Sequence, residues 1–292
     1  MNLRHVLNIT LSTAAFAMAG AGACLAAEPV LHAATVKGSL GPITDPGADF
    51  WKQAPAIKVV TQPQNVAEPQ NTKPAIGDLS VKAMHNGEWL AFLIEWADPT
   101  KSNRIVVDEF GDQVAVEMPV TYKAGDTPNP MMGAPGERVN IMQWRAAFQH
   151  DIDTGALDGP KPSDLYPNMH ADVYPDQVLK AADARAYMGA VGVDNPVSRP
   201  LQSPVIEQMA EGFGSLTALP EQHASGKGVW ANGRWHVVIT RPLAVGDAYS
   251  PSLRPGSNTL AAFAVWDGGS KEVGSRKAWA NWVELKLDPV KP

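Results

Sequence analysis

Two places in this sequence carry side chains that can donate to a metal: a lysine near the C-terminus and a pair of methionines near the middle. Lys277 stands between an arginine and an Ala-Trp pair, while Met131 and Met132 lie between a proline and a glycine. By residue type alone, such a lysine is more often a surface cation and such a methionine more often a filler of apolar gaps. Residue type therefore leaves an ordinary structural role open at both places.

The segments around these residues are predicted strands. Residues 260–266 are apolar and rich in small side chains, which indicates a buried strand, and the Asp-Gly-Gly-Ser run at 267–270 ends it. Residues 282–287 close the chain as a last strand. Residues 114–120 form a further strand before the methionine loop. The lysine and the methionines are thus expected on loops that strands hold in place.

Two hairpins strengthen the prediction of a β protein. In the first, an Asn-Gly pair at residues 86–87 separates strands at 79–84 and 89–96, and this pair favours a type I′ turn. The second has the same pair at residues 232–233, between segments 228–231 and 234–242. With possible strands near residues 30–36 and 57–60, the chain has at least seven strands. We expect an all-β fold, an antiparallel β-sandwich with helical and loop insertions.

Composition supports a globular, loop-rich protein. The chain has 292 residues, 45% of them hydrophobic and 18% charged, with 25 glycines and 25 prolines. The formal net charge of -6 argues against nucleic acid as a partner. No nucleotide-binding, HExxH or GxSxG motif occurs in a supporting context, and the acidic residues are too dispersed to single out a catalytic pair.

The N-terminal segment has the pattern of a secretory signal peptide. A short basic region precedes an Ala-rich apolar core, and small residues allow cleavage near residue 27, so residues 1–27 are predicted to be removed and the protein to be periplasmic. A membrane anchor and lipid attachment at Cys24 are the alternatives. Cys24 is the only cysteine, so the mature chain would lack thiols for disulfides, Fe–S clusters or covalent haem attachment.

The remaining residues, 28–292, are predicted to form a single domain with a loop-rich insertion at about 149–219. This insertion contains many prolines and one predicted helix, at residues 177–190.

The ordered motifs resemble a known family. The C-terminal pattern FAVWDGG…VGSRKAWANW resembles that of the haem-binding gamma subunits of ethylbenzene dehydrogenase, dimethylsulfide dehydrogenase, and selenate and chlorate reductases, a cytochrome c-552/DMSO reductase-like haem-binding domain. In that family a lysine and a methionine are the axial ligands of a b-type haem. The resemblance implies that Lys277 is one ligand and Met132 the other, with Met131 as the close alternative to Met132. Less favoured methionines are Met118, Met142 and Met169.

Further segments agree with the resemblance, in order along the chain. They lie at residues 49–54, 166–175 and 203–216, so the match covers nearly all of the mature chain. It implies one non-covalent haem b, with Trp144, Trp266 and Arg276 as cofactor-binding residues. Other candidate cations for the haem propionates are Arg145, Arg234 and Lys271. Histidine, the usual alternative ligand, is present at His85, His170, His223 and His236, each of which is predicted to be structural or exposed.

The family resemblance implies a function without catalysis in this chain. With both axial positions filled, the iron transfers electrons, so the protein is expected to be a periplasmic electron-transfer subunit of an oxidoreductase complex of the DMSO reductase type. Its expected partners are a molybdopterin catalytic subunit, an Fe–S subunit and a soluble or membrane electron carrier. The alternative is a haem-free sugar-binding module, because the Trp-rich hairpins also resemble family-9 carbohydrate-binding modules. Sugar binding would have no use for Lys277 or the methionine pair.

Overall fold

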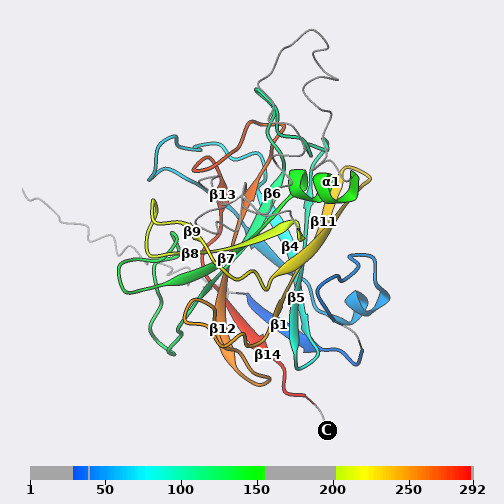
Figure 1. Ribbon diagram of the computed structural model, residues 1–292, viewed down its shortest axis with the longest axis vertical. Coiled ribbons are helices and arrows are strands. Elements are labelled where there is room, and N and C mark those ends of the chain that lie inside the picture. Colours follow the sequence, from blue (N-terminus) through cyan, green and yellow to red (C-terminus); the bar gives the residue numbers. More distant parts are fainter. Residues whose placement is uncertain (1–28, 39, 155–201, 291–292) are drawn as a thin grey trace, which may run out of the picture.

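The computed structural model describes residues 29–38, 40–154 and 202–290. These residues form strands with one short α-helix and one 3-10 helix (Figure 1). The first half of the fold comprises β1 (Val30–Thr35), η1 (Asp49–Gln53), β2 (Ile57–Val60), β3 (Gln62–Pro63), β4 (Asp78–His85), β5 (Trp89–Ala97), β6 (Gln113–Pro119), β7 (Val139–Arg145) and α1 (Ala146–Thr154). The second half comprises β8 (Val205–Ala210), β9 (Thr217–Ala218), β10 (Ser225–Ala231), β11 (Arg234–Pro242), β12 (Asn258–Trp266), β13 (Ala278–Trp279) and β14 (Val283–Leu287). The all-β prediction is confirmed.

The strands pair in the order β10-β11-β5-β4-β1-β14-β12-β6-β7-β8-β9. Strand β12 joins two halves of the sheet, because its first residues pair with β14 and its last residues pair with β6 and β13. The sheet is mixed rather than purely antiparallel, since β1 runs parallel to both β4 and β14. Figure 1 shows β1, in blue, beside β14, in red, although they come from opposite ends of the chain.

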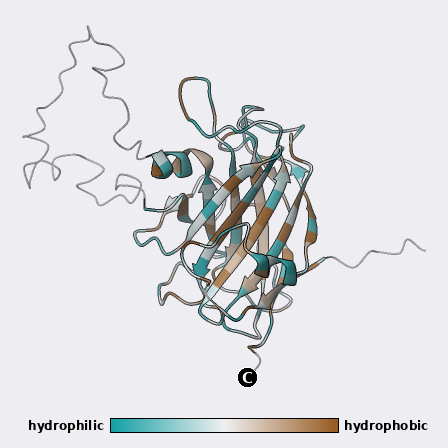
Figure 2. Cartoon of the chain, turned by 90° about the vertical axis from the view of Figure 1, so that its right-hand side faces the viewer, coloured by the Kyte–Doolittle hydropathy of each residue, from teal (hydrophilic) through white to brown (hydrophobic). Residues whose placement is uncertain are grey.

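The core lies between the two halves of the sheet. Strands β4 and β5 contribute buried residues such as Leu79 and Phe92, and β6 and β7 contribute Val116 and Trp144 from the facing side. Figure 2 shows brown and teal residues alternating along neighbouring strands, as expected when successive side chains point to opposite faces. Phe92 meets Phe263 of β12 edge to face at a centroid distance of 6.3 Å, which joins the two halves.

The two Asn-Gly hairpins turn differently. Asn232 and Gly233 both have positive φ angles, of 52° and 71°, and form the two-residue loop between β10 and β11 that the pair favours. In the first hairpin only Gly87 has a positive φ, of 96°. There the Asn86 N–H donates to the Trp89 carbonyl, and the Asn86 side chain accepts the backbone N–H groups of residues 88 and 89. The turn is therefore centred on Gly87 and Glu88, and the predicted type I′ turn is wrong.

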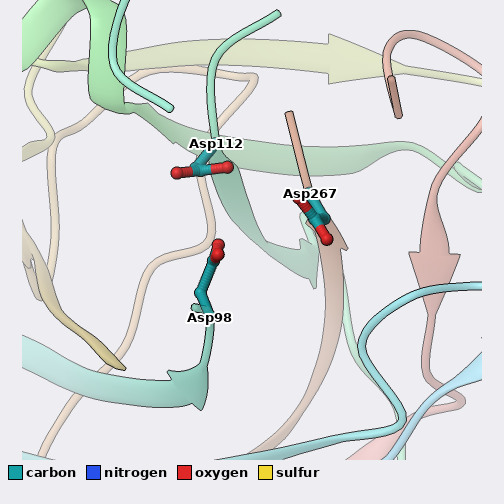
Figure 3. A group of neighbouring side chains, drawn as sticks. All are labelled: Asp98, Asp112 and Asp267. Atoms are coloured by element: carbon teal, nitrogen blue, oxygen red, sulfur yellow. The ribbon is translucent and has the colours of Figure 1, made fainter. Parts of the chain in front are cut away.

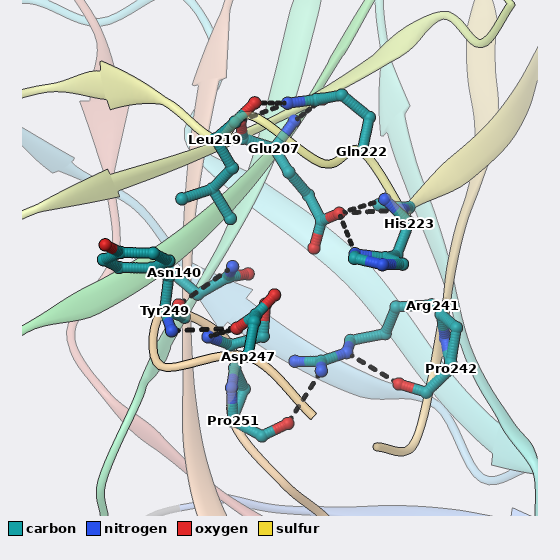
Figure 4. Close-up of polar contacts among 12 residues, drawn as sticks. Asn140, Glu207, Leu219, Gln222, His223, Arg241, Pro242, Asp247, Tyr249 and Pro251 are labelled. Atoms are coloured by element: carbon teal, nitrogen blue, oxygen red, sulfur yellow. Dashed lines mark hydrogen bonds and ion pairs between the residues drawn. The ribbon is translucent and has the colours of Figure 1, made fainter. Parts of the chain in front are cut away.

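A buried polar cluster closes the space between β8, β11 and the segment before β12 (Figure 4). The Glu207 carboxylate accepts backbone N–H groups from His223 and Ala224. The Arg241 guanidinium donates to the carbonyl oxygens of Pro242 and Pro251 at 3.0 and 2.7 Å. Burial lowers the pKa of Arg241 to about 10, and the nearby Glu207 carboxylate opposes that shift. These contacts satisfy backbone groups that strands do not pair.

Several sequence predictions fall outside the described residues. These are the signal peptide with Cys24, the helix at 177–190 and most of the insertion at 149–219. At the start of that insertion, α1 follows β7 directly, a helix that the sequence pattern did not indicate. Nowhere in the described ranges does a helix combine the length and the apolar character needed to cross a membrane.

Candidate functional site

A cavity of about 550 Å³ lies on the outer face of the sheet half formed by β6, β7, β8 and β12. Its size falls within the range of small-molecule and cofactor sites. The cavity is mainly apolar, and its walls come from the loop before β7 and the segment before β13. The residues that line it include Ala115, Glu117, Met131, Met132, Ile141, Gln143, Arg145, Ala262, Ala264, Trp266 and Lys277.

The alternation of the strands forms the floor of the cavity. On β6, Ala115 and Glu117 face it, whereas Val116 between them faces the core. On β12, Ala262 and Ala264 face it. The three alanines leave space over the middle of the sheet, within which a ligand can lie against the strands.

The methionine pair lies in the loop between β6 and β7. Met132 has a positive φ of 66°, which is uncommon for a residue with a side chain and is found mostly where surrounding contacts hold it. Its carbonyl oxygen accepts the Gly212 N–H at 2.7 Å. Met131 has its own N–H bonded to the side chain of Asn129 at 2.9 Å. Both methionines line the cavity, and the side chain of Met132 also packs against the apolar cluster on its floor.

Lys277 is far from the methionine pair in the sequence, directly before β13, but it lines the same cavity. It is half-buried, and its Nζ stands 5.8 Å from the centroid of the Trp266 ring, within cation–π range. The Trp266 indole N–H donates to the Gly274 carbonyl at 2.9 Å, which fixes the segment leading to the lysine. Burial lowers the pKa of Lys277, so the neutral amine is easier to reach than in water.

Glu117 is a polar residue of the cavity that interacts both with Lys277 and with the methionine loop. Burial raises the pKa of its carboxyl, and the Lys277 ammonium and the Met132 backbone N–H act in the opposite direction. Glu117 therefore interacts with the lysine and with the methionine loop at once. No pattern in the sequence indicated this residue, because a glutamate in an alternating strand carries no signal that distinguishes it from a solvent-facing one.

Arg145 brings a positive charge to the cavity. One of its guanidinium nitrogens donates to Gln143 at 3.0 Å, and Gln143 in turn donates to Gln113 at 2.7 Å. The Nε atom of Arg145 is buried without a hydrogen-bond partner, and burial lowers the pKa of the side chain. A buried, unpartnered donor at the cavity wall suits an anionic group of a ligand.

Of the predicted cofactor-binding residues, one lines the cavity and two do not. Trp266 lines the cavity, whereas Trp144 does not: it lies on the core face of β7, at a centroid distance of 5.0 Å from Trp235. The period of two explains this, since Gln143 and Arg145 on either side of Trp144 face the cavity. Arg276 is half-buried next to Lys277 but is outside the lining, and its Nε has no partner.

The remaining candidates lie elsewhere. Lys271 forms an exposed ion pair with Asp108 at 2.9 Å, and Arg234 is exposed at the tip of the second hairpin. Met118 and Met142 belong to the core. Of the candidate histidines, His85, His223 and His236 do not line the cavity, and Met169 and His170 lie outside the described residues.

The fold is an all-β sandwich, and its candidate site places thioethers, an amine, a guanidinium and a carboxyl around one mainly apolar cavity. The family described as ethylbenzene dehydrogenase matches residues 48–278, so the chain belongs to that family.

Two relatives and two solved structures resemble the chain. It is 25% identical to the chlorate reductase subunit gamma of Ideonella dechloratans over 93% of this chain and 90% of that protein. It is 23% identical to the putative respiratory nitrate reductase heme subunit ORF7 of Haloferax mediterranei, over 84% of this chain and 68% of that protein. A family-9 carbohydrate-binding module of Caldicellulosiruptor kristjanssonii in complex with cellotriose has a TM-score of 0.41 at 10% identity. The match covers 90% of this chain and 95% of that module. A putative carbohydrate-binding protein of Bacteroides uniformis has a TM-score of 0.41 at 9% identity. The match covers 89% of this chain and 100% of that protein.

Proposed function

We propose that this protein is a b-type haem-binding electron-transfer subunit of an oxidoreductase complex. The observation that carries the proposal is that Met131, Met132 and Lys277, far apart in the sequence, line one mainly apolar cavity. Membership of the ethylbenzene dehydrogenase family and the two named relatives support it. Haem bound with both axial positions occupied would supply reversible one-electron chemistry without an open position for substrate.

Each side chain has a defined part in holding the cofactor. The Met132 sulfur is a soft, neutral ligand, and the backbone contacts on both sides of this residue restrict its loop. Met131 is the alternative, since it lines the same cavity. Lys277 ligates only as the neutral amine, and its removal from water favours that form. In water, deprotonating a lysine at pH 7 costs about 4–5 kcal/mol.

The remaining polar groups suit the periphery of the cofactor. Arg145 is suited to pair with a propionate, because the residue lines the cavity and its Nε is buried without a partner. The Trp266 ring lies beside the Lys277 amine and also lines the cavity. We assign one haem to the cavity and none elsewhere, held without covalent attachment.

The setting of the subunit is also part of the proposal. We infer that the partners are a molybdopterin catalytic subunit and an Fe–S subunit, with a soluble or membrane electron carrier. The names of the two relatives support membership of a reductase complex. Export to the periplasm rests on the N-terminal signal pattern.

An absorption spectrum tests the proposal. Mature protein expressed with sufficient haem is examined oxidised and dithionite-reduced, followed by a pyridine haemochrome assay. We expect a low-spin b-type spectrum with one haem per chain. Lys277→Ala and Met132→Ala should each change the spectrum or lower the haem content, and Met131→Ala should leave both unchanged.

A matched control separates ligation from a general loss of charge. Lys271→Ala removes a lysine from the same C-terminal segment but outside the cavity, and it should retain the spectrum. If Met131→Ala changes the spectrum and Met132→Ala leaves it normal, Met131 rather than Met132 would be the haem ligand. No Soret band in the wild-type protein would overturn the electron-transfer function, and binding assays with oligosaccharides would then test the alternative.

A further inference from the structure

Three buried aspartates meet away from the cavity, at one end of the fold. Asp98 follows β5, Asp112 precedes β6 and Asp267 follows β12. One carboxylate oxygen of each lies within 4.8 Å of the others. Figure 3 shows Asp98 pointing towards Asp112, with Asp267 beside both. None of the three lines the cavity described above.

The surrounding donors hold these side chains in fixed orientations. Asp112 accepts the Gly268 N–H at 2.9 Å and the Trp235 indole N–H at 2.9 Å. Asp267 accepts the backbone N–H and the hydroxyl of Ser270 at 3.1 and 2.8 Å. These neutral donors orient the carboxylates without cancelling their charge, which is the arrangement expected around a bound cation.

One oxygen in the cluster has no partner. Asp98 is 1% exposed, and its Oδ1 accepts the N–H and hydroxyl of Thr100, but its Oδ2 is buried without a hydrogen bond. The Trp96 indole N–H acts on Asp98 and opposes the rise of its pKa, but no hydrogen bond of ordinary geometry joins the two. A buried carboxylate oxygen without a partner is costly, and the Asp98 side chain points towards the carboxylate of Asp112.

The charge of the cluster is also uncompensated. Among the described residues, no lysine, arginine or histidine forms an ion pair with any of the three carboxylates. Burial and the neighbouring Asp98 carboxylate raise the pKa of Asp112 to about 7, and burial raises the pKa of Asp98. Three buried like charges are unfavourable, so such a cluster binds either protons or a cation.

We infer that Asp98, Asp112 and Asp267 form a binding site for one Ca²⁺ ion, separate from the haem cavity. All three ligands are oxygens, which hard divalent cations prefer. Oxygens up to 4.8 Å apart can share one Ca²⁺, because each Ca–O distance is about 2.3–2.6 Å. Mg²⁺ suits the site less well, since it usually retains several waters and these residues are at most 8% exposed.

The position of the site gives the ion a structural role. Asp98 comes from the sheet half that contains β4 and β11, whereas Asp112 and Asp267 come from the half that contains β7. One cation would therefore join the two halves at the ends of three strands. It would also fix the turn after β12, where Gly268 donates to Asp112.

Calorimetric and thermal titration of the full mature protein tests this inference. After EDTA treatment and removal of the chelator, we expect CaCl₂ to bind at one ion per chain. At a Ca²⁺ concentration about 100 times the dissociation constant, the Tm should rise by about 5–10 °C. Mg²⁺ at the same concentration should give a smaller rise. A Mg²⁺ effect equal to or larger than that of Ca²⁺ would overturn the assignment to calcium.

Asn substitutions separate cation binding from the other contacts of these side chains. Asp98→Asn removes one charge with little change of shape, so Ca²⁺ should bind at least about 10-fold more weakly. The Tm of this variant in EDTA should equal or exceed that of the wild type, because repulsion is relieved. Asp267→Asn provides a second variant with the same expected loss if Asp98→Asn does not fold.

The control is Asp108→Asn, which removes a carboxylate that is 73% exposed and paired with Lys271. It should bind Ca²⁺ like the wild type. The inference fails if the EDTA-treated wild type shows neither calorimetric binding nor a Tm rise, or if the variant at Asp98 or Asp267 that folds retains wild-type affinity. The outcome is independent of the haem proposal, because the spectrum is measured separately on the same samples.

Discussion

Individual side chains in this fold acquire chemistry from burial rather than from residue type. Lys277 illustrates this, since removal from water lowers the pKa of an amine that would otherwise remain charged. His85 is a second case. Its Nε2–H donates to the Asp288 carbonyl oxygen at 2.7 Å, and its Nδ1 is buried without a partner. Burial lowers the pKa of His85 from 6.5, with the Asp288 contacts acting in the opposite direction.

The lowered pKa of His85 predicts a pH effect on stability. Below pH 6.5 the unfolded chain takes up a proton that the folded protein resists, so the free energy of unfolding should fall as the pH decreases below that value. His85→Gln removes this titration and retains a donor for Asp288. Thermal unfolding between pH 5 and pH 7.5 should therefore show a smaller loss of Tm at low pH in the variant. An equal or steeper loss would contradict the prediction.

At the scale of elements, the loop between β6 and β7 decides where the methionines lie. The Trp282 indole N–H, from the C-terminal segment, donates to the Pro128 carbonyl at 2.6 Å. Gly212, after β8, holds the Met132 carbonyl. The loop is thus attached to both sides of the cavity floor. Gly133 completes it, with a φ of +73° and so little space that an added Cβ would overlap the Glu137 carbonyl oxygen.

Gly133→Ala should therefore displace this loop. The positive φ and the overlap with Glu137 predict a loss of about 2 kcal/mol or more in the free energy of unfolding, together with weaker haem retention. Urea unfolding and the pyridine haemochrome assay measure the two effects. Gly136→Ala is the matched control, since Gly136 has a φ of +82° but nothing within 4 Å of an added Cβ. It should cost about 1 kcal/mol and keep the haem, and equal losses in the two variants would refute the argument.

At the scale of the whole molecule, two sheet halves enclose one core and leave the cavity on an outer face. Strand β12 belongs to both halves and contributes side chains to the core and to the cavity floor. Phe92 of β5 is fully buried against this strand and does not line the cavity. Core stability and ligand binding can therefore be tested separately.

Phe92→Ala should lower the free energy of unfolding by about 3–5 kcal/mol, because it removes a fully buried aromatic ring and leaves a hole. The urea midpoint should fall while the slope stays unchanged. Haem content of the folded fraction should remain one per chain. Val60→Ala, at a side chain that is 63% exposed, is the control and should change stability by less than about 0.5 kcal/mol. Loss of haem without loss of stability would contradict the separation of core and cavity.

The sequence by itself determined the class of fold and most of its strands. Alternating patterns, apolar runs and Asn-Gly pairs are local signals, and they identified β1, β2, β4, β5, β6, β10, β11, β12 and β14. They gave no sign that β1 pairs in parallel with β4 and β14, because such pairing joins distant segments. They also missed the helix α1, and the family resemblance assigned Trp144 to the cofactor, although its face of β7 packs into the core.

The family motifs directed attention to Lys277 and to the methionine pair, and the fold brought them to one cavity. Only the tertiary structure revealed Glu117 between them and the unpartnered nitrogen of Arg145. It also gathered three aspartates that had seemed dispersed along the chain. The physical reason is the same in each case. Local patterns record which face of a strand is apolar, whereas charge pairing and ligand geometry depend on strands that meet only after the sheet has closed.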